Sequence, residues 1–261
     1  MRLNQGTIPK GQILIAVVLL LIVSGCTRIE TYANDIDPFL LYSVRLKDHS
    51  LKVIEVKGRI FGSGRRSVRL RPLSSCDGSM LEPIGFTAVG PEGERLPVKR
   101  IDDIYVVETN GSDFTFSYDV VLTVEDRYSP EIRSMLTFLD RDRCRLFGKD
   151  FFLLPELALT DGIIVDFDLF PGGELQTSWA TNGTRTLLPS IEDLPLTMVV
   201  SGDYRLIEER IGGIDVRFAI AGEWSFRDRE FFNVIKSIVS EEMALFGSAP
   251  HERYIFVCDR N

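Results

Sequence analysis

Histidine is the scarcest potential catalytic residue of this chain, with two in 261 residues. A hydrolytic zinc site needs two histidines one helical turn apart, a third ligand and a glutamate that activates water. His49 and His251 are far apart in the sequence. His251-Glu252 matches the start of such a motif, but Ile255 stands where the second histidine is needed. We therefore expect no catalytic residue and no metal ligand in this chain, and two histidines that lie on the surface.

An excess of positive charge is also missing. The chain has 30 lysines and arginines against 38 acidic residues, a net charge of −8. Proteins that bind nucleic acids neutralise phosphates with clustered basic side chains, and anionic lipid surfaces attract the same clusters. The composition therefore argues against nucleic acid as a partner and against adhesion to a membrane by charge alone.

The apolar run near the N-terminus is too short to span a bilayer. It covers residues 13–23, whereas a transmembrane helix needs about 20 apolar residues. Arg2 and Lys10 precede it and small residues follow it, which is the pattern of an export signal. The junction Val23-Ser24-Gly25-Cys26 resembles the lipobox of bacterial lipoproteins, in which the cysteine is lipidated and becomes the first residue of the mature chain.

This resemblance implies a lipoprotein signal peptide at residues 1–25, a lipid on Cys26 and a tether at residues 26–38. Thr27 follows the cysteine where an aspartate would favour retention in the inner membrane. The expected location is the cell envelope, on the periplasmic face of the outer membrane, with the lipid anchor as the contact to the membrane. An uncleaved signal anchor with a chance cysteine is the alternative.

Cysteine is scarce as well, with four in the chain. If Cys26 carries a lipid, Cys76, Cys144 and Cys258 remain, an odd number for an oxidising compartment. Cys76 and Cys144 are the first candidates for a disulfide, because both occur in turn-rich stretches. Three free thiols are equally compatible, since sequence does not establish the geometry that a disulfide needs.

Alternation of apolar and polar residues predicts β-strands along most of the chain. It is clearest at residues 114–124 and recurs at 163–169 and 214–220. In the first predicted hairpin the alternation slips at Ile54, as a β-bulge would cause. Turn residues separate these segments and no helical segment intervenes. The pattern predicts an antiparallel β-sandwich over residues 39–222.

The pattern changes after Gly222. Apolar residues recur at helical spacing over residues 228–246, with Asp228 as the expected N-cap and Gly247 as the C-terminal stop. Residues 254–257 then predict a buried strand. One helix and one strand do not complete a domain, so residues 223–261 are expected to be the truncated start of a second domain. The apolar stripe of the helix is expected to need a partner sheet that is missing from this chain.

Several short segments, in this order, resemble the N-terminal part of the glycyl aminopeptidase family of zinc metallopeptidases. The matching segments, in chain order, are Leu41-Tyr42-Ser43-Val44-Arg45-Leu46, Gly93-Glu94-Arg95-Leu96-Pro97-Val98, Phe138-Leu139-Asp140-Arg141-Asp142-Arg143, Phe218-Ala219-Ile220-Ala221-Gly222 and Tyr254-Ile255-Phe256-Val257. The resemblance implies a β-sandwich followed by the first helix and strand of a thermolysin-like catalytic domain. It implies zinc for the full-length family, but the family's metal-binding motif is not present in this chain.

Two hypotheses follow. In the first, the chain is the non-catalytic N-terminal part of a lipid-anchored aminopeptidase-type enzyme; it supports peptide substrate binding, is inactive alone, and its partner is the missing catalytic portion. In the second, it is a non-enzymatic β-sandwich lipoprotein of the envelope that binds a protein or a ligand. Fold alone does not separate the two.

Overall fold

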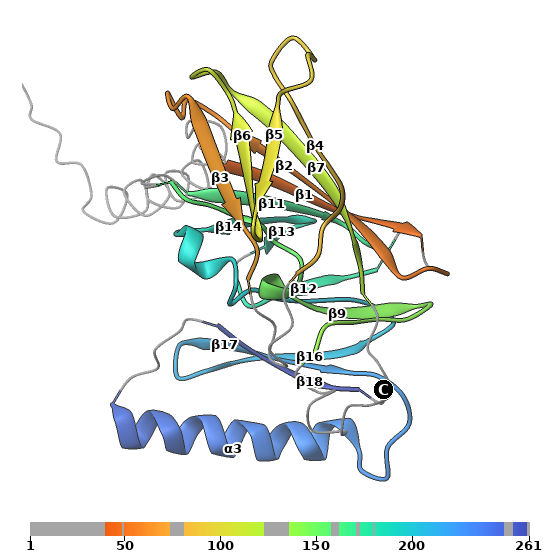
Figure 1. Cartoon of the computed structure of the whole chain (residues 1–261). Helices are drawn as coiled ribbons and strands as arrows, with labels where there is room; N and C mark the ends of the chain where they lie inside the picture. Colours follow the sequence, from red (N-terminus) through yellow and green to blue (C-terminus); the bar gives the residue numbers. More distant parts are fainter. Residues whose placement is uncertain are drawn as a thin grey trace, which may run out of the picture. The chain divides into compact units, whose positions relative to one another are not determined.

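The chain folds mainly as β-structure, as the sequence predicts. The computed structural model describes residues 40–48, 50–73, 81–122, 136–157, 162–170, 173–179, 181–247 and 253–259. These residues belong to one compact unit, and among them α3 (Asp228–Phe246) is the one α-helix. Figure 1 shows the sheets stacked above this helix.

Four sheets account for the strands of the described residues. The large sheet has the order β13-β14-β11-β1-β2-β7-β4, with the bounds Thr181–Asn182, Arg185–Leu188, Ile163–Asp168, Leu40–Asp48, Val53–Ile60, Phe114–Val121 and Ile84–Val89. The cover sheet has the order β10-β3-β6-β5, with the bounds Leu154–Pro155, Ser67–Arg71, Ile104–Glu108 and Val98–Ile101.

Two smaller sheets complete the fold. The middle sheet has the order β12-β15-β9-β8, with the bounds Leu175–Thr177, Met198–Gly202, Arg143–Phe147 and Phe138–Leu139. The C-terminal sheet has the order β16-β17-β18, with the bounds Arg205–Ile211, Ile214–Ile220 and Arg253–Cys258. Two short 3-10 helices, η1 (Gly148–Asp150) and η2 (Ile191–Asp193), lie between strands.

Most strand pairs are antiparallel, which confirms the predicted class. Two pairs are parallel, β1 with β11 and β17 with β18. The alternation of apolar and polar residues does not predict the parallel pairing of β1 with β11. The predicted bulge is present in the β1–β2 hairpin, where the register shifts between Leu46 and Asp48 opposite Ile54. The extra residue therefore lies in β1 rather than at Ile54 itself.

Aromatic side chains fill the core between the large sheet and the cover sheet. Phe114, Phe116 and Tyr118 alternate along β7 and are buried, while the residues between them are half-exposed. Opposite Phe116 the partner strand has a glycine, and a Cβ at Gly58 would lie 2.2 Å from the Phe116 ring. The Tyr118 hydroxyl donates a 2.8 Å hydrogen bond to the Phe151 carbonyl, which satisfies its polar atom inside the core.

A second, smaller core lies between α3 and the C-terminal sheet. Phe232, Ile235 and Val239 of α3 pack on the apolar face of β16 and β17. The helix has the predicted bounds and ends at Gly247 in the left-handed conformation (φ 78°). Its N-cap, however, is Arg227 and not Asp228, because Asp228 already has helical geometry and pairs with Arg205.

The expectation that the partner sheet of the helix is missing from this chain is therefore wrong. β16 and β17, which the sequence groups with the sandwich, pair with β18 beneath α3. The sheet that carries the helix therefore starts at Arg205, before the predicted division at residue 223. Alternating apolar residues in these strands predict their existence but not the sheet that they join.

Candidate functional site

Most of the residues that the sequence singles out lie outside the described residues: Cys26, Cys76, His49 and His251. Cys144 lies in β9, is fully buried, and is disulfide-bonded to no other described cysteine. Burial raises the pKa of the Cys144 thiol well above its ordinary value, so the thiol stays protonated. The Cys76–Cys144 disulfide and the lipid on Cys26 therefore stay predictions.

The described residues do not fit a zinc site. They contain no group of three or more histidines, cysteines, aspartates or glutamates placed to hold a metal ion. The zinc that the family resemblance implies would need ligands other than these residues. Within the same residues, no helix is long and apolar enough to cross a membrane.

A buried ion pair joins the end of β18 to the middle sheet. Arg145 Nη1 lies 2.6 Å from both carboxylate oxygens of Asp259, and each side chain is 4% exposed. The Tyr204 hydroxyl is 3.3 Å from the same carboxylate. Burial and the nearby Asp259 raise the pKa of Tyr204, so its hydroxyl remains a hydrogen-bond donor.

Two further arginines extend this polar contact, which we call the arginine seam (Arg145, Arg217, Arg253). Arg217 of β17 donates to the amide oxygen of Gln176, a buried residue of β12. Arg253 of β18 donates to the Trp179 carbonyl and lies 3.4 Å from Asp215. The C-terminal sheet is therefore held to the middle sheet by directional hydrogen bonds, which set its orientation more than apolar packing would.

One flank of α3 is fixed to β16 by charge. Glu209 of β16 accepts hydrogen bonds from Lys236 and from Arg229, the latter at 2.8 Å. These two hydrogen bonds hold the pKa of Glu209 below its ordinary value, with the Lys236 bond as the larger cause. At the start of the helix, Arg205 pairs with Asp228 at 2.6 Å and lowers the pKa of that carboxyl. The helix is therefore anchored on its β16 side.

The opposite flank of α3 is apolar and exposed. Its residues recur at spacings of three, four and seven, which places them on one side of the helix. We call them the apolar flank: Phe231, Val234, Ile238 and Leu245. Val234 is 54% exposed and Ile238 is 50% exposed, whereas Ile235, on the neighbouring buried stripe, is 5% exposed. The helix thus has more apolar surface than the sheet beneath it covers.

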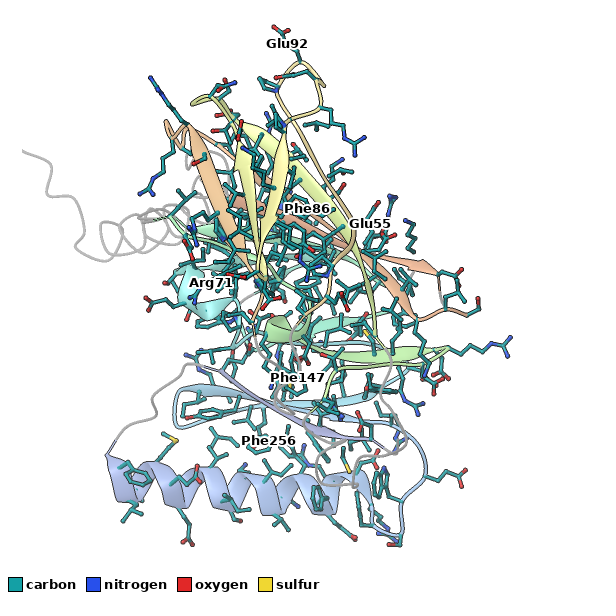
Figure 2. The ribbon with its side chains drawn as sticks, in the orientation of Figure 1. Glu55, Arg71, Phe86, Glu92, Phe147 and Phe256 are labelled. Atoms are coloured by element: carbon teal, nitrogen blue, oxygen red, sulfur yellow. The ribbon has the colours of Figure 1, made fainter. Side chains whose placement is uncertain are left out.

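The last strand, β18, is the strand of this sheet farthest from β16, to which the other flank of α3 is fixed. It pairs with β17 on one side, and no described strand pairs with its other edge. All six of its residues are half-buried, and Phe256 lies between β18 and α3 (Figure 2). The apolar flank and the outer edge of β18 together form the α3–β18 surface. An open strand edge beside exposed apolar side chains is the arrangement that receives another strand and its covering side chains.

Sequence reasoning anticipated the helix but not this surface. The apolar residues of the helix at 228–246 include both the buried stripe and the apolar flank. Together they form a face wider than one small sheet covers. The three arginines of the seam bind partners that are distant in sequence, as Arg145 binds Asp259, so no local sequence motif predicts these contacts.

Comparison with known proteins finds matches by structure but none by sequence. No family model and no curated protein matches the sequence. The aminopeptidase N family protein from Idiomarina loihiensis matches the structure with a TM-score of 0.70 and 18% identity, over 83% of this chain and 38% of that chain. The M1 zinc metallopeptidase from Deinococcus radiodurans (TM-score 0.47, 11% identity, 86% and 57% covered) and yeast LTA4 hydrolase (TM-score 0.46, 10% identity, 84% and 36% covered) resemble it more loosely.

The fold is therefore that of the N-terminal part of zinc aminopeptidases of the aminopeptidase N type. This chain spans 38% of the length of the Idiomarina protein. The predicted resemblance to zinc aminopeptidases is confirmed at the level of fold, while the narrower glycyl aminopeptidase assignment and the signal peptide stay predictions.

Proposed function

We propose that this protein is a membrane-anchored lipoprotein that serves as the non-catalytic scaffold of an aminopeptidase-type zinc metallopeptidase. The sandwich supports peptide substrate binding, and further polypeptide that carries the zinc ligands packs on the α3–β18 surface. The observation that carries this proposal is the coincidence of two features. The fold matches the N-terminal part of an aminopeptidase N family protein, and its last sheet has an open edge beside an exposed apolar flank.

The chemistry of the surface defines what binds there. A strand paired with β18 satisfies its free backbone groups, and a helix or loop beside that strand covers Val234 and Ile238. The occupant is therefore a folded polypeptide that continues the C-terminal sheet. The match covers 38% of the Idiomarina protein, so that protein has further chain outside the matched part. In this proposal the zinc ligands come from this occupant, because the described residues contain no group placed to hold a metal ion.

The lipid on Cys26 is the proposed anchor. The net charge of −8 gives no electrostatic attraction to anionic lipid, so a covalent lipid has to supply the binding. This places the sandwich at the membrane surface of the cell envelope, with the tether of residues 26–38 between lipid and fold.

The test starts from the native protein, extracted from its own membranes with detergent. We expect an intact mass that corresponds to residues 26–261 plus lipid, or a larger one if the catalytic portion is covalently continuous. We further expect zinc-dependent release of N-terminal alanine or glycine to co-purify with the protein and to be lost after chelation. Ile238→Glu on the apolar flank abolishes this activity in the extract, whereas Ser237→Glu, at an exposed position opposite the buried stripe of α3, leaves it unchanged.

Other outcomes contradict separate parts of the proposal. A lipidated mass with no associated peptidase activity overturns the enzyme scaffold and favours an envelope lipoprotein that binds a ligand. A mass that includes residues 1–25 and no lipid overturns the anchor. Zinc-dependent activity of residues 1–261 on their own contradicts the expectation that the catalytic portion lies outside them.

A further inference from the structure

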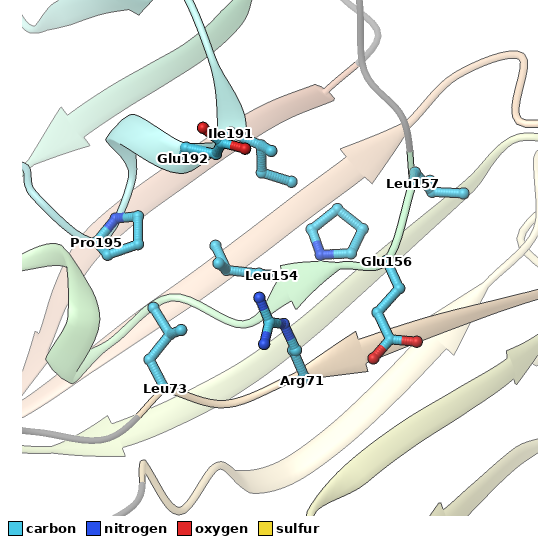
Figure 3. A pocket seen from close by; sticks show the side chains of 9 residues that line it. Arg71, Leu73, Leu154, Glu156, Leu157, Ile191, Glu192 and Pro195 are labelled. Carbon is cyan, nitrogen blue, oxygen red and sulfur yellow. The ribbon is translucent and has the colours of Figure 1, made fainter.

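A hollow of about 500 Å³ lies beside the cover sheet, far in sequence from the α3–β18 surface. It is bounded by the ends of β3 and β10 and by η2 (Figure 3). This volume lies within the range of small-molecule sites in proteins, about 300–1,000 Å³.

Arg71 is the cationic group of the hollow, and the structure describes no acidic partner for it. Arg69, two residues earlier on the same face of β3, is paired with Glu156 at 2.8 Å. Glu156 also lines the hollow, and its carboxylate is already engaged by Arg69. In a chain with more acidic than basic residues, a guanidinium left without a carboxylate at the mouth of a hollow is suited to an external anion.

The rest of the lining is mainly apolar. Six of the nine lining residues are leucine, isoleucine or proline. Leu154 is 6% exposed and forms part of the floor, while Leu73 and Ile191 are half-buried. Figure 3 shows the Arg71 guanidinium and the Leu154 side chain pointing into the same space. An apolar group bound here would be removed from water while a charge attached to it reached Arg71.

Glu192 sets a limit on the charge of such a ligand. It lies on η2, across the hollow from β3, and no described basic side chain pairs with it. A second negative charge on the ligand would be repelled by this carboxylate. The hollow therefore suits a single anionic group with an apolar body, and disfavours a dianion.

We propose that this hollow binds a monocarboxylate with an apolar body, whose carboxylate pairs with Arg71 while the body packs on Leu154 and Ile191. A peptide with a free carboxyl end after an apolar residue carries this chemistry, and so does a short fatty acid. The site does not depend on the proposed peptidase function, because it lies on the sandwich and needs neither zinc nor α3.

The experiment measures binding to the purified full-length protein by titration calorimetry or ligand-observed NMR. Acetyl-leucine and acetyl-alanyl-leucine represent a peptide carboxyl end, octanoate represents a fatty acid, and acetyl-leucinamide lacks the charge. We expect the carboxylates to bind about tenfold more tightly than the amide, the difference that one charge-assisted contact supplies. The tighter of the dipeptide and octanoate identifies the natural source.

Variants then assign the contacts. Arg71→Gln should weaken acetyl-leucine about tenfold, to the level of the amide. The control Arg45→Gln, at an exposed arginine of β1 that does not line the hollow, should leave the affinity within about twofold. Ile191→Ser should weaken octanoate and acetyl-leucine alike, and Glu192→Gln should allow succinate to bind. Equal affinity for acetyl-leucine and its amide, an unchanged affinity in Arg71→Gln, or no binding of any carboxylate overturns the proposal.

Discussion

The two hydrophobic cores of this protein are closed to different degrees. In the sandwich, Phe114, Phe116 and Tyr118 are covered by a second sheet and have almost no contact with solvent. In the C-terminal layer, the helix covers β16 and β17, while β18 and one flank of α3 stay half-exposed. The described residues of the sandwich are buried as in a closed domain, whereas the C-terminal layer has apolar surface that none of its described residues covers.

The contact between the two cores is polar. Arg145, Arg217 and Arg253 connect the sheets through a carboxylate, an amide and a carbonyl rather than through shared apolar side chains. A buried ion pair orients its elements but adds little net stability, because desolvation offsets the attraction. We therefore expect the two cores to unfold as separate units, with the C-terminal layer opening first.

Truncating one aromatic in each core tests this separation and has the largest expected effect. Phe116→Ala and Phe232→Ala each remove a fully buried ring, a change that costs about 3–5 kcal/mol of unfolding free energy. Hydrogen exchange measured by mass spectrometry should show loss of protection throughout the sandwich for Phe116→Ala. For Phe232→Ala the loss should be confined to residues 205–259. Equal loss of protection in both regions for Phe232→Ala contradicts two separate cores.

The arginine seam is the next largest test. Arg145→Met leaves Asp259 buried without its partner, which costs about 3–5 kcal/mol in the element that contains it. We expect faster hydrogen exchange in β18 and little change in the large sheet. Asp259→Leu added to Arg145→Met removes the stranded charge and should restore most of the protection. A double variant as labile as the single one would mean that Arg145 acts through packing rather than through its charge.

The sequence predicts the elements of both cores better than their connections. Alternation identifies β7, β11 and β17, and helical spacing identifies α3 to the residue, because these signals are local. The parallel pairing of β1 with β11 and the inclusion of β16 in the C-terminal sheet depend on contacts between distant segments. For the same reason the Arg145–Asp259 pair and the hollow at Arg71 could not be predicted, since each brings together residues from several elements.

Acid should weaken the attachment of α3 to β16, and the loss of stability should be smaller than in the variants above. The pKa values of Glu209 and Asp228 are lowered in the folded state by their basic partners. Their contribution to stability is therefore complete above the carboxyl pKa of the unfolded chain, about 4, and is lost as pH falls through the lower folded values. We expect the helical circular dichroism signal to fall below about pH 4, and added salt to weaken the pairs at neutral pH because they are exposed. In Glu209→Gln with Asp228→Asn this acid-dependent loss should be absent; its persistence would assign the transition to other groups.

Ile238→Glu has the smallest expected effect on stability, and it tests directly whether the C-terminal core is open while the sandwich core is closed. Ile238 is 50% exposed on the apolar flank, so a carboxylate there reaches water, and the unfolding free energy should change by no more than about 0.5 kcal/mol. Ser237→Glu introduces the same side chain at an exposed position opposite the buried stripe of α3 and should behave alike in the isolated chain. Under the proposed function the two variants should differ in the complex with the catalytic polypeptide, because Ile238 would be buried there and its replacement would leave an unpaired charge in the interface. Thermal unfolding of the isolated chain and of the membrane extract measures both effects. If Ile238→Glu instead destabilises the isolated chain by several kcal/mol, the flank is already covered within residues 1–261, and the difference between a closed and an open core disappears.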